Sequence, residues 1–300
     1  MSFTVIDLSQ LPPPKVVEPL DYEQIIAEMI DQLVKLQPDF TALLESDPAY
    51  KILEVCAYRE MLLRAKINDE AQAVMLPYAT GSDLDNLGAL WNVKRLVIDA
   101  GDPDAIPPRE PTYETDSALR YRIQLSMEGQ TNAGTEGSYI FQSLSASGQV
   151  KDAKPKRQND ADIINTILSH EGDGTPSADL LKTVTDHLMQ KHVRQLTDDL
   201  TVQGATITTY RVKADLYTQG GLGVEQVMNA ARDAVQKFVE SRHKLGAIVP
   251  VSGIYGALQQ AGVSRVVLHE PAADITPTDV QAAYCSAIEL TQKQEVLNSV

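Results

Sequence analysis

Few residues in this sequence combine the types and spacings that catalysis or metal binding requires. His170, Glu171 and Asp173 lie together in the segment HEGDG, and His187 and His192 lie five positions apart. Neighbouring loop residues seldom converge on one ion without ligands from elsewhere in the chain. Two histidines five apart on a helix point about 140° away from each other, so they cannot bind one metal ion together. We therefore expect a solvated turn and surface histidines at these positions.

Two glycine-containing segments resemble loops that bind nucleotides or present a nucleophile, and each lacks a defining residue. The glycines of GGLG (220–223) lie where a strand would lead into a helix, but Gln226 replaces the third glycine of the dinucleotide-binding pattern. In GVSRV (262–266), Val266 replaces the second glycine of a nucleophile elbow. The sequence therefore predicts no catalytic residue, no cofactor-binding residue and no metal ligand. This favours a protein that acts through its surfaces.

Charge and composition narrow the classes of partner. The chain of 300 residues carries 26 basic and 41 acidic side chains, a net charge of −15. Nucleic acids and anionic membranes are bound through clustered positive charge, so neither is expected as a partner. The two cysteines allow no disulfide framework, and the N-terminus has no signal-peptide pattern. No run of apolar residues is long enough to predict a membrane span.

One basic stretch stands out on this acidic chain. The segment KDAKPKR (151–157) carries four positive side chains: Lys151, Lys154, Lys156 and Arg157. Such charges on an exposed strand edge deter unwanted strand pairing. A docking patch for an acidic partner, including another copy of the chain, is the alternative.

The first 95 residues predict an arm followed by helices. Residues 1–20, with three successive prolines, are expected to be extended, either lying across a neighbouring subunit or free. Helices are expected from Asp21 to Pro38, from Asp47 to about Met75, and from Ser82. The second of these helices carries an apolar stripe: Ile52, Val55, Cys56, Leu62, Leu63 and Ile67.

The remainder alternates between strand and helix patterns after a connector at 96–115 that is rich in proline and glycine. Strands are expected at 148–158, 162–170, 200–219 and 263–269, and helices at 116–128, 138–147, 175–191, 224–243 and 251–260. The predicted fold class is α+β, a helical N-terminal region followed by mixed α/β domains. The predicted division is an arm (1–20), a helical domain (21–95), a linker (96–115), a central domain (116–195) and a C-terminal domain (196–300).

The helix in GSDLDNLGALWNVKR (81–95) contains an unexplained glycine. Ser82 and Asp85 form a capping-box-like pair at its start, and Gly88 interrupts its apolar face. Glycine costs about 1 kcal/mol relative to alanine in a helix, so a close approach by another segment should require it. That segment is either the helix at 48–75 or a partner protein.

The same segment resembles the signature of the baseplate J family of contractile phage tails, through Gly81, Leu84, Asp85, Leu87, Gly88, Val93 and Arg95. Further family landmarks follow in order: the pair Arg120 and Arg122, TEGSYIFQSLS (135–145), VKDAKP (150–155), EGDGTPSADL (171–180) and the stretch 245–268. Gln195 replaces the usual proline of one turn. The resemblance covers about residues 20–280, and the short 96–115 segment replaces a β-rich insert of larger members.

The resemblance implies a structural component of the baseplate wedge, located in the virion and assembled in the host bacterial cytoplasm. It implies four partners: a second copy of the chain, the adjacent wedge protein (baseplate protein I), a lysozyme-like wedge component and the central tail hub. The expected interface residues are Leu84, Leu87, Gly88, Leu90, Trp91 and Arg95. The alternatives are an equivalent component of a contractile bacteriocin or secretion machine, or a tail-associated hydrolase. Without its partners the chain should expose apolar patches.

Overall fold

The structure, a computed structural model, describes residues 6–8, 11–12, 20–38, 44–131, 134–159, 161–194, 197–218 and 223–294. The chain forms two compact units. The helical unit comprises Thr4–Arg95 and Thr115–Ile123, and the α/β unit comprises Met1–Phe3, Leu96–Glu114 and Gln124–Val300. Gln195 and most of the GGLG loop lie outside the described residues. None of the helices in the described ranges is long and apolar enough to cross a membrane.

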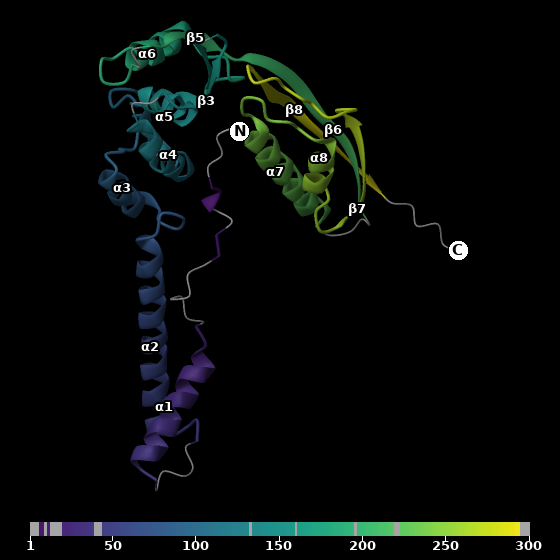
Figure 1. The fold of residues 1–300 in the computed structure, drawn as a ribbon. Helices are drawn as coiled ribbons and strands as arrows, with labels where there is room; N and C mark the ends of the chain where they lie inside the picture. The colour runs from purple at the N-terminus through teal and green to yellow at the C-terminus, as the bar shows by residue number, and fades with distance from the viewer. Residues whose placement is uncertain are drawn as a thin grey trace. The chain divides into compact units, whose positions relative to one another are not determined.

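The helical unit contains two helices that pack against each other. Helix α1 (Tyr22–Leu36) lies along α2 (Pro48–Ala73) (Figure 1). Asp21 caps α1 by accepting a hydrogen bond from the Gln24 backbone N–H, at 3.1 Å. Asp47 and Pro48 begin α2 as predicted, because proline suits a first helical turn. The buried core between the two helices is small: Ile25, Ile26 and Ala57.

The third helix, α3 (Gly81–Leu90), begins earlier than predicted, because Thr80 and not Ser82 occupies its N-cap position. The predicted capping pair of Ser82 and Asp85 is therefore wrong. The first backbone N–H of α3 is instead bound from outside the helix, because Gly81 N donates to the Asp116 carboxylate at 3.1 Å. Asp116 is the first residue of α4 (Asp116–Gly129).

The first sheet of the α/β unit has the order β3-β4-β5. Its strands are β3 (Val150–Arg157), β4 (Asp162–Ser169) and β5 (Asp199–Gly204). β3 and β4 pair antiparallel and β4 and β5 pair parallel, with α6 (Ala178–Leu188) in the crossover between them. Helix α5 (Glu136–Ala146) packs against β3.

The second sheet has the order β7-β6-β8, from β7 (Val263–Glu270), β6 (Thr206–Thr218) and β8 (Gln281–Gln294). Alternate residues of β6, among them Val212, Ala214 and Leu216, are fully buried. They share a core with α7 (Val224–Arg242) and α8 (Val251–Leu258), so both helices pack on one face of this sheet (Figure 1). This period-two burial explains why β6 reads clearly as a strand.

The α+β class is confirmed, as are the strands at 150–157 and 162–169. The single strand predicted at 200–219 is two strands, β5 and β6, joined by Ala205 alone, so one extended run serves both sheets. Strand β8 was not predicted. The predicted linker contains a short hairpin of β1 (Val97–Asp99) and β2 (Thr112–Tyr113). The five-part domain division stays a prediction.

Candidate interaction surface

Gly88 is required by contacts inside the helical unit. A Cβ at this position would lie 2.7 Å from the Val93 carbonyl oxygen and 3.2 Å from the Ile123 side chain of α4. The chain folds back over α3 here, since Val93 N donates to the Gly88 carbonyl at 2.9 Å. Neither predicted neighbour, α2 or a partner protein, accounts for the glycine. The correction is that α4 and the turn after α3 occupy the space.

Arg95 ties this turn to α4. Its guanidinium donates to Asp85 at 2.8 Å and to Asp116 at 2.7 Å. The Arg95 side chain is 16% exposed, so most of it is packed within the unit. The Gly81 hydrogen bond, followed by Arg95, lowers the pKa of the Asp116 carboxyl. Arg95 thus has a structural role, and its membership of an interface stays a prediction.

The paired arginines of α4 bind backbone carbonyls. Arg120 donates to Leu76 O at 2.7 Å and to Ala79 O at 2.6 Å, in the segment that joins α2 to α3. Arg122 is buried and donates to Lys94 O at 2.6 Å. Charge-assisted hydrogen bonds of this kind satisfy carbonyls that lie beyond the helix ends. The arginines therefore fix the path of the chain around α3.

The other predicted interface residues differ in how far they are buried, and they form three groups. Leu84 is fully buried inside the helical unit, and Gly88 is buried as well. Leu87 is half-buried. Leu90 is 76% exposed and Trp91 is 43% exposed at the end of α3. Only the last turn of α3 therefore offers apolar surface, and its contact with a partner stays a prediction.

An uncovered apolar surface lies on α2, and we call it the α2 stripe. Its members recur at helical spacing on one side of the helix and are exposed by 49% (Leu62) to 65% (Ile67): Ile52, Val55, Leu62, Leu63 and Ile67, with exposed Cys56 among them. Helix α1 packs on another side of α2, where Ala57 is fully buried. The sequence showed this stripe. It did not show which of the two apolar sides of α2 the chain itself covers.

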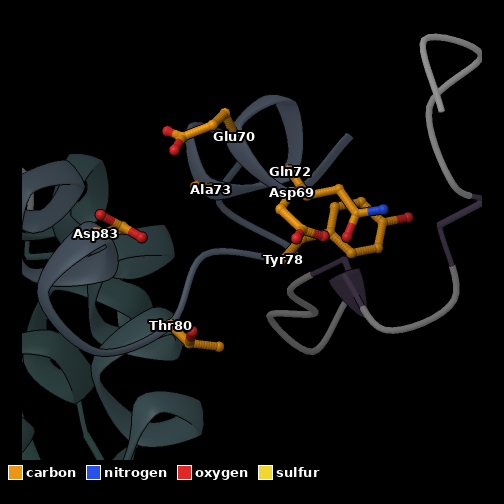
Figure 2. A pocket seen from close by; sticks show the side chains of 7 residues that line it. All are labelled: Asp69, Glu70, Gln72, Ala73, Tyr78, Thr80 and Asp83. Carbon is orange, nitrogen blue, oxygen red and sulfur yellow. The ribbon is translucent and has the colours of Figure 1, made fainter. Parts of the chain in front are cut away.

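An acidic hollow of about 300 Å³ lies where α2 ends and α3 begins (Figure 2). It is lined by Asp69, Glu70, Gln72, Ala73, Tyr78, Thr80 and Asp83. The carboxylates of Glu70 and Asp83 are spread apart, as Figure 2 shows, and do not converge on one point. Within the described ranges, no group of three or more His, Cys, Asp or Glu residues could hold a metal ion.

The basic stretch, the glycine loop and His187, which the sequence offered as possible binding or catalytic residues, have structural roles in the α/β unit. Lys154 and Lys156 both pair with Asp279, at 2.8 and 3.4 Å, so the basic stretch is partly neutralised within the chain. Gly223 has a φ of 107° at the start of α7, a conformation that favours glycine. His187 lies 3.0 Å from the Gln142 side chain and is half-buried rather than on the surface.

Known protein families match both the helical part and the C-terminal part of this chain. The family model for the Baseplate J-like N-terminal domain matches residues 45–102, which contain α2 and α3. The model for the Baseplate J-like protein C-terminal domain matches residues 210–291. The chain is 40% identical over 289 residues to Baseplate protein J of Escherichia phage P2, covering 94% of this chain and 96% of the relative. The chain belongs to the baseplate J family of phage tail baseplate proteins.

Proposed function

We propose that this protein is a structural component of the baseplate wedge of a contractile phage tail. It acts in baseplate assembly and in the ring that rearranges on contraction, and it catalyses no reaction. The family membership supports the baseplate role. The α2 stripe is the observation that supports action through protein–protein contact. A helix with an uncovered apolar side requires a partner to cover it.

The energetics of the α2 stripe suit an interface. Burying a Val, Leu or Ile side chain contributes about 1.5–3 kcal/mol, so covering the five partly exposed members contributes roughly 5–8 kcal/mol before the costs of association. Leu90 and Trp91 at the end of α3 add apolar surface of the same kind. Large uncharged side chains are typical of interface centres, and a tryptophan frequently contributes most.

The partners are a second copy of the chain, the adjacent wedge protein, a lysozyme-like wedge component and the tail hub. Assembly takes place in the host cytoplasm and the product is part of the virion. The same stripe would serve an equivalent component of a contractile bacteriocin or secretion machine. The genes next to this one would distinguish these machines from a phage tail. A hydrolase would require converging carboxylates, and the acidic hollow lacks this arrangement.

The test is co-expression of the chain with its adjacent wedge protein, followed by affinity capture and light scattering. A variant with Val55→Glu and Leu63→Glu places two charges in the α2 stripe. We expect it to melt like the original chain and to lose at least tenfold in capture of the partner. Ile248→Glu, at a residue with similar exposure in the α/β unit, is the matched control and should retain capture. Capture by the double variant at the original level would contradict the proposal.

A further inference from the structure

The two sheets of the α/β unit meet through polar contacts made by β3, and we call this contact the β3 joint. Lys151 Nζ lies 2.8 Å from His243 Nδ1, just after α7. The Asp152 carboxylate accepts a hydrogen bond from the Leu245 backbone N–H at 2.9 Å. Further along β3, Lys154 and Lys156 pair with Asp279. Residues along one edge strand therefore hold two segments that lie beside the second sheet, one after α7 and one before β8.

The apolar core behind the β3 joint is small. It consists of four buried residues, Leu168, Ala205, Leu245 and Ala282, with Ile207 packed against them. Leu245 also forms an isolated bridge with Ala282 of β8. The hydrogen bonds of Lys151 and Asp152 therefore add to a small apolar contact between the two sheets.

His243 is the member of the β3 joint whose charge can change. Its side chain is buried, with 8% of the residue exposed, and its ring lies 5.4 Å from that of Tyr284. A lysine ammonium only donates hydrogen bonds, so His243 Nδ1 must accept the one from Lys151. The ring is then neutral and carries its proton on Nε2. A second proton can bind only at Nδ1, where it would face the ammonium and abolish the hydrogen bond.

We propose that the β3 joint is an acid-sensitive latch: proton binding at His243 Nδ1 breaks the contact with Lys151 and loosens the first sheet from the second. The cost of placing two cations in contact within a buried site drives the opening. The Leu245 contact lies two residues beyond His243, so the segment 243–246 moves as a whole when the histidine leaves its place.

The surrounding charges set the pH at which the latch opens. Burial, followed by the Lys151 ammonium and then His170, lowers the pKa of His243 to about 4, and Asp173 opposes this shift. Burial also lowers the pKa of Lys151, while Glu240 and Asp152 favour its charged form and Lys244 disfavours it. Burial raises the pKa of Asp152, so acid favours the buried form of this carboxyl and its protonation does not drive the opening.

Two measurements on the full chain test the latch. The first follows the imidazole NMR signals of His243 between pH 8 and pH 3.5. We expect His243 to titrate more than one pH unit below 6.5, the usual pKa of an unperturbed histidine, and Lys151→Met to raise the His243 midpoint by at least half a unit. A His243 midpoint near 6.5, or no response to Lys151→Met, would overturn the proposal.

The second measurement is amide hydrogen exchange, corrected for the intrinsic pH dependence of the rates. Protection at 150–154 and 244–246 should fall about tenfold between pH 7 and pH 4.5, more than protection in α1 and α2. His243→Gln keeps an acceptor for Lys151 but cannot titrate, so this fall should disappear. His269→Gln, which changes an exposed histidine paired with Asp215, should leave the fall unchanged. The same fall in His243→Gln as in the original chain would refute the latch.

Discussion

Arg95 and Asp116 are joined by a hydrogen-bonded ion pair of 2.7 Å that connects the turn after α3 to the first residue of α4. The other oxygen of the same carboxylate binds Gly81 N, so Asp116 holds both ends of the α3 segment. Gly81 and Arg95, two positions of the segment that resembles the family signature, therefore maintain one local fold together with Asp116. This fold presents the last turn of α3, with Leu90 and Trp91, to the exterior.

Replacing Arg95 with lysine should destabilise the helical unit by about 1–3 kcal/mol. A lysine carries one compact ammonium and cannot donate to Asp85 and Asp116 in the same fixed geometry. Urea unfolding followed by the fluorescence of Trp91, the single tryptophan of the chain, measures this loss. Arg109→Lys is the control, because Arg109 is largely exposed and its pair with Asp99 is 3.4 Å long. Equal effects of the two substitutions would show that Arg95 has no special role.

Replacing Gly88 with alanine should lower the free energy of unfolding by about 1–3 kcal/mol, despite the higher helix propensity of alanine. The added methyl group meets the Val93 carbonyl, which cannot move without opening the turn. Gly256→Ala in α8 is the control, since a Cβ there meets nothing within 4 Å. Circular dichroism of both variants during thermal unfolding gives the comparison. A more stable Gly88→Ala variant would contradict the packing described for this glycine.

The helices and most strands could be predicted because their patterns are local. The spacing in α1, the proline at the start of α2 and the alternation in β6 each depend on a few neighbouring residues. Strand β8 was missed because its 14 residues show mixed burial along their length, and its place beside β6 depends on a parallel pairing far along the chain.

The candidate surface was predicted only in part, because burial also depends on contacts between segments far apart in the sequence. Apolar spacing identified the α2 stripe and the α3 face, but burial depends on which neighbour occupies each side. Ile123 of α4, 35 positions after Gly88, covers the middle of α3, and only the folded chain shows this. The contact between Lys151 and His243 spans 92 positions and has no local signal.

Neutralising Asp279 should have a small and salt-dependent effect. This carboxylate lies 46% exposed between Lys154 and Lys156, and exposed ion pairs contribute about 0–1 kcal/mol. We expect Asp279→Asn to lower the melting temperature of the α/β unit slightly at low salt. The difference from the original chain should vanish at about 1 M salt, where screening acts within a few ångströms. Calorimetry at both salt concentrations checks this, and a difference that persists in high salt would contradict it.

The free energy of unfolding should fall as the pH drops from about 6.5 towards 4. Burial lowers the pKa of His243 to about 4 in the folded chain, and an unfolded histidine has a pKa near 6.5. The unfolded state therefore binds more protons across this window, which contributes about 3 kcal/mol of lost stability. Burial lowers the pKa of His187 in the same direction. Urea midpoints at pH 7.5, 5.5 and 4.5 measure the trend, which should be weaker in His243→Gln. Midpoints independent of pH would contradict it.

The central claim, that a partner covers the α2 stripe, can be tested without any substitution. Cys56 is an exposed thiol within the stripe, and half-buried Cys285 in β8 serves as an internal reference. The measurement is the rate of thiol labelling at each cysteine, by mass spectrometry, in the free chain and in tails purified from the phage that encodes it. Labelling of Cys56 should slow at least tenfold in the tails relative to Cys285. Equal rates at Cys56 in the free chain and in the assembled tails would contradict the account.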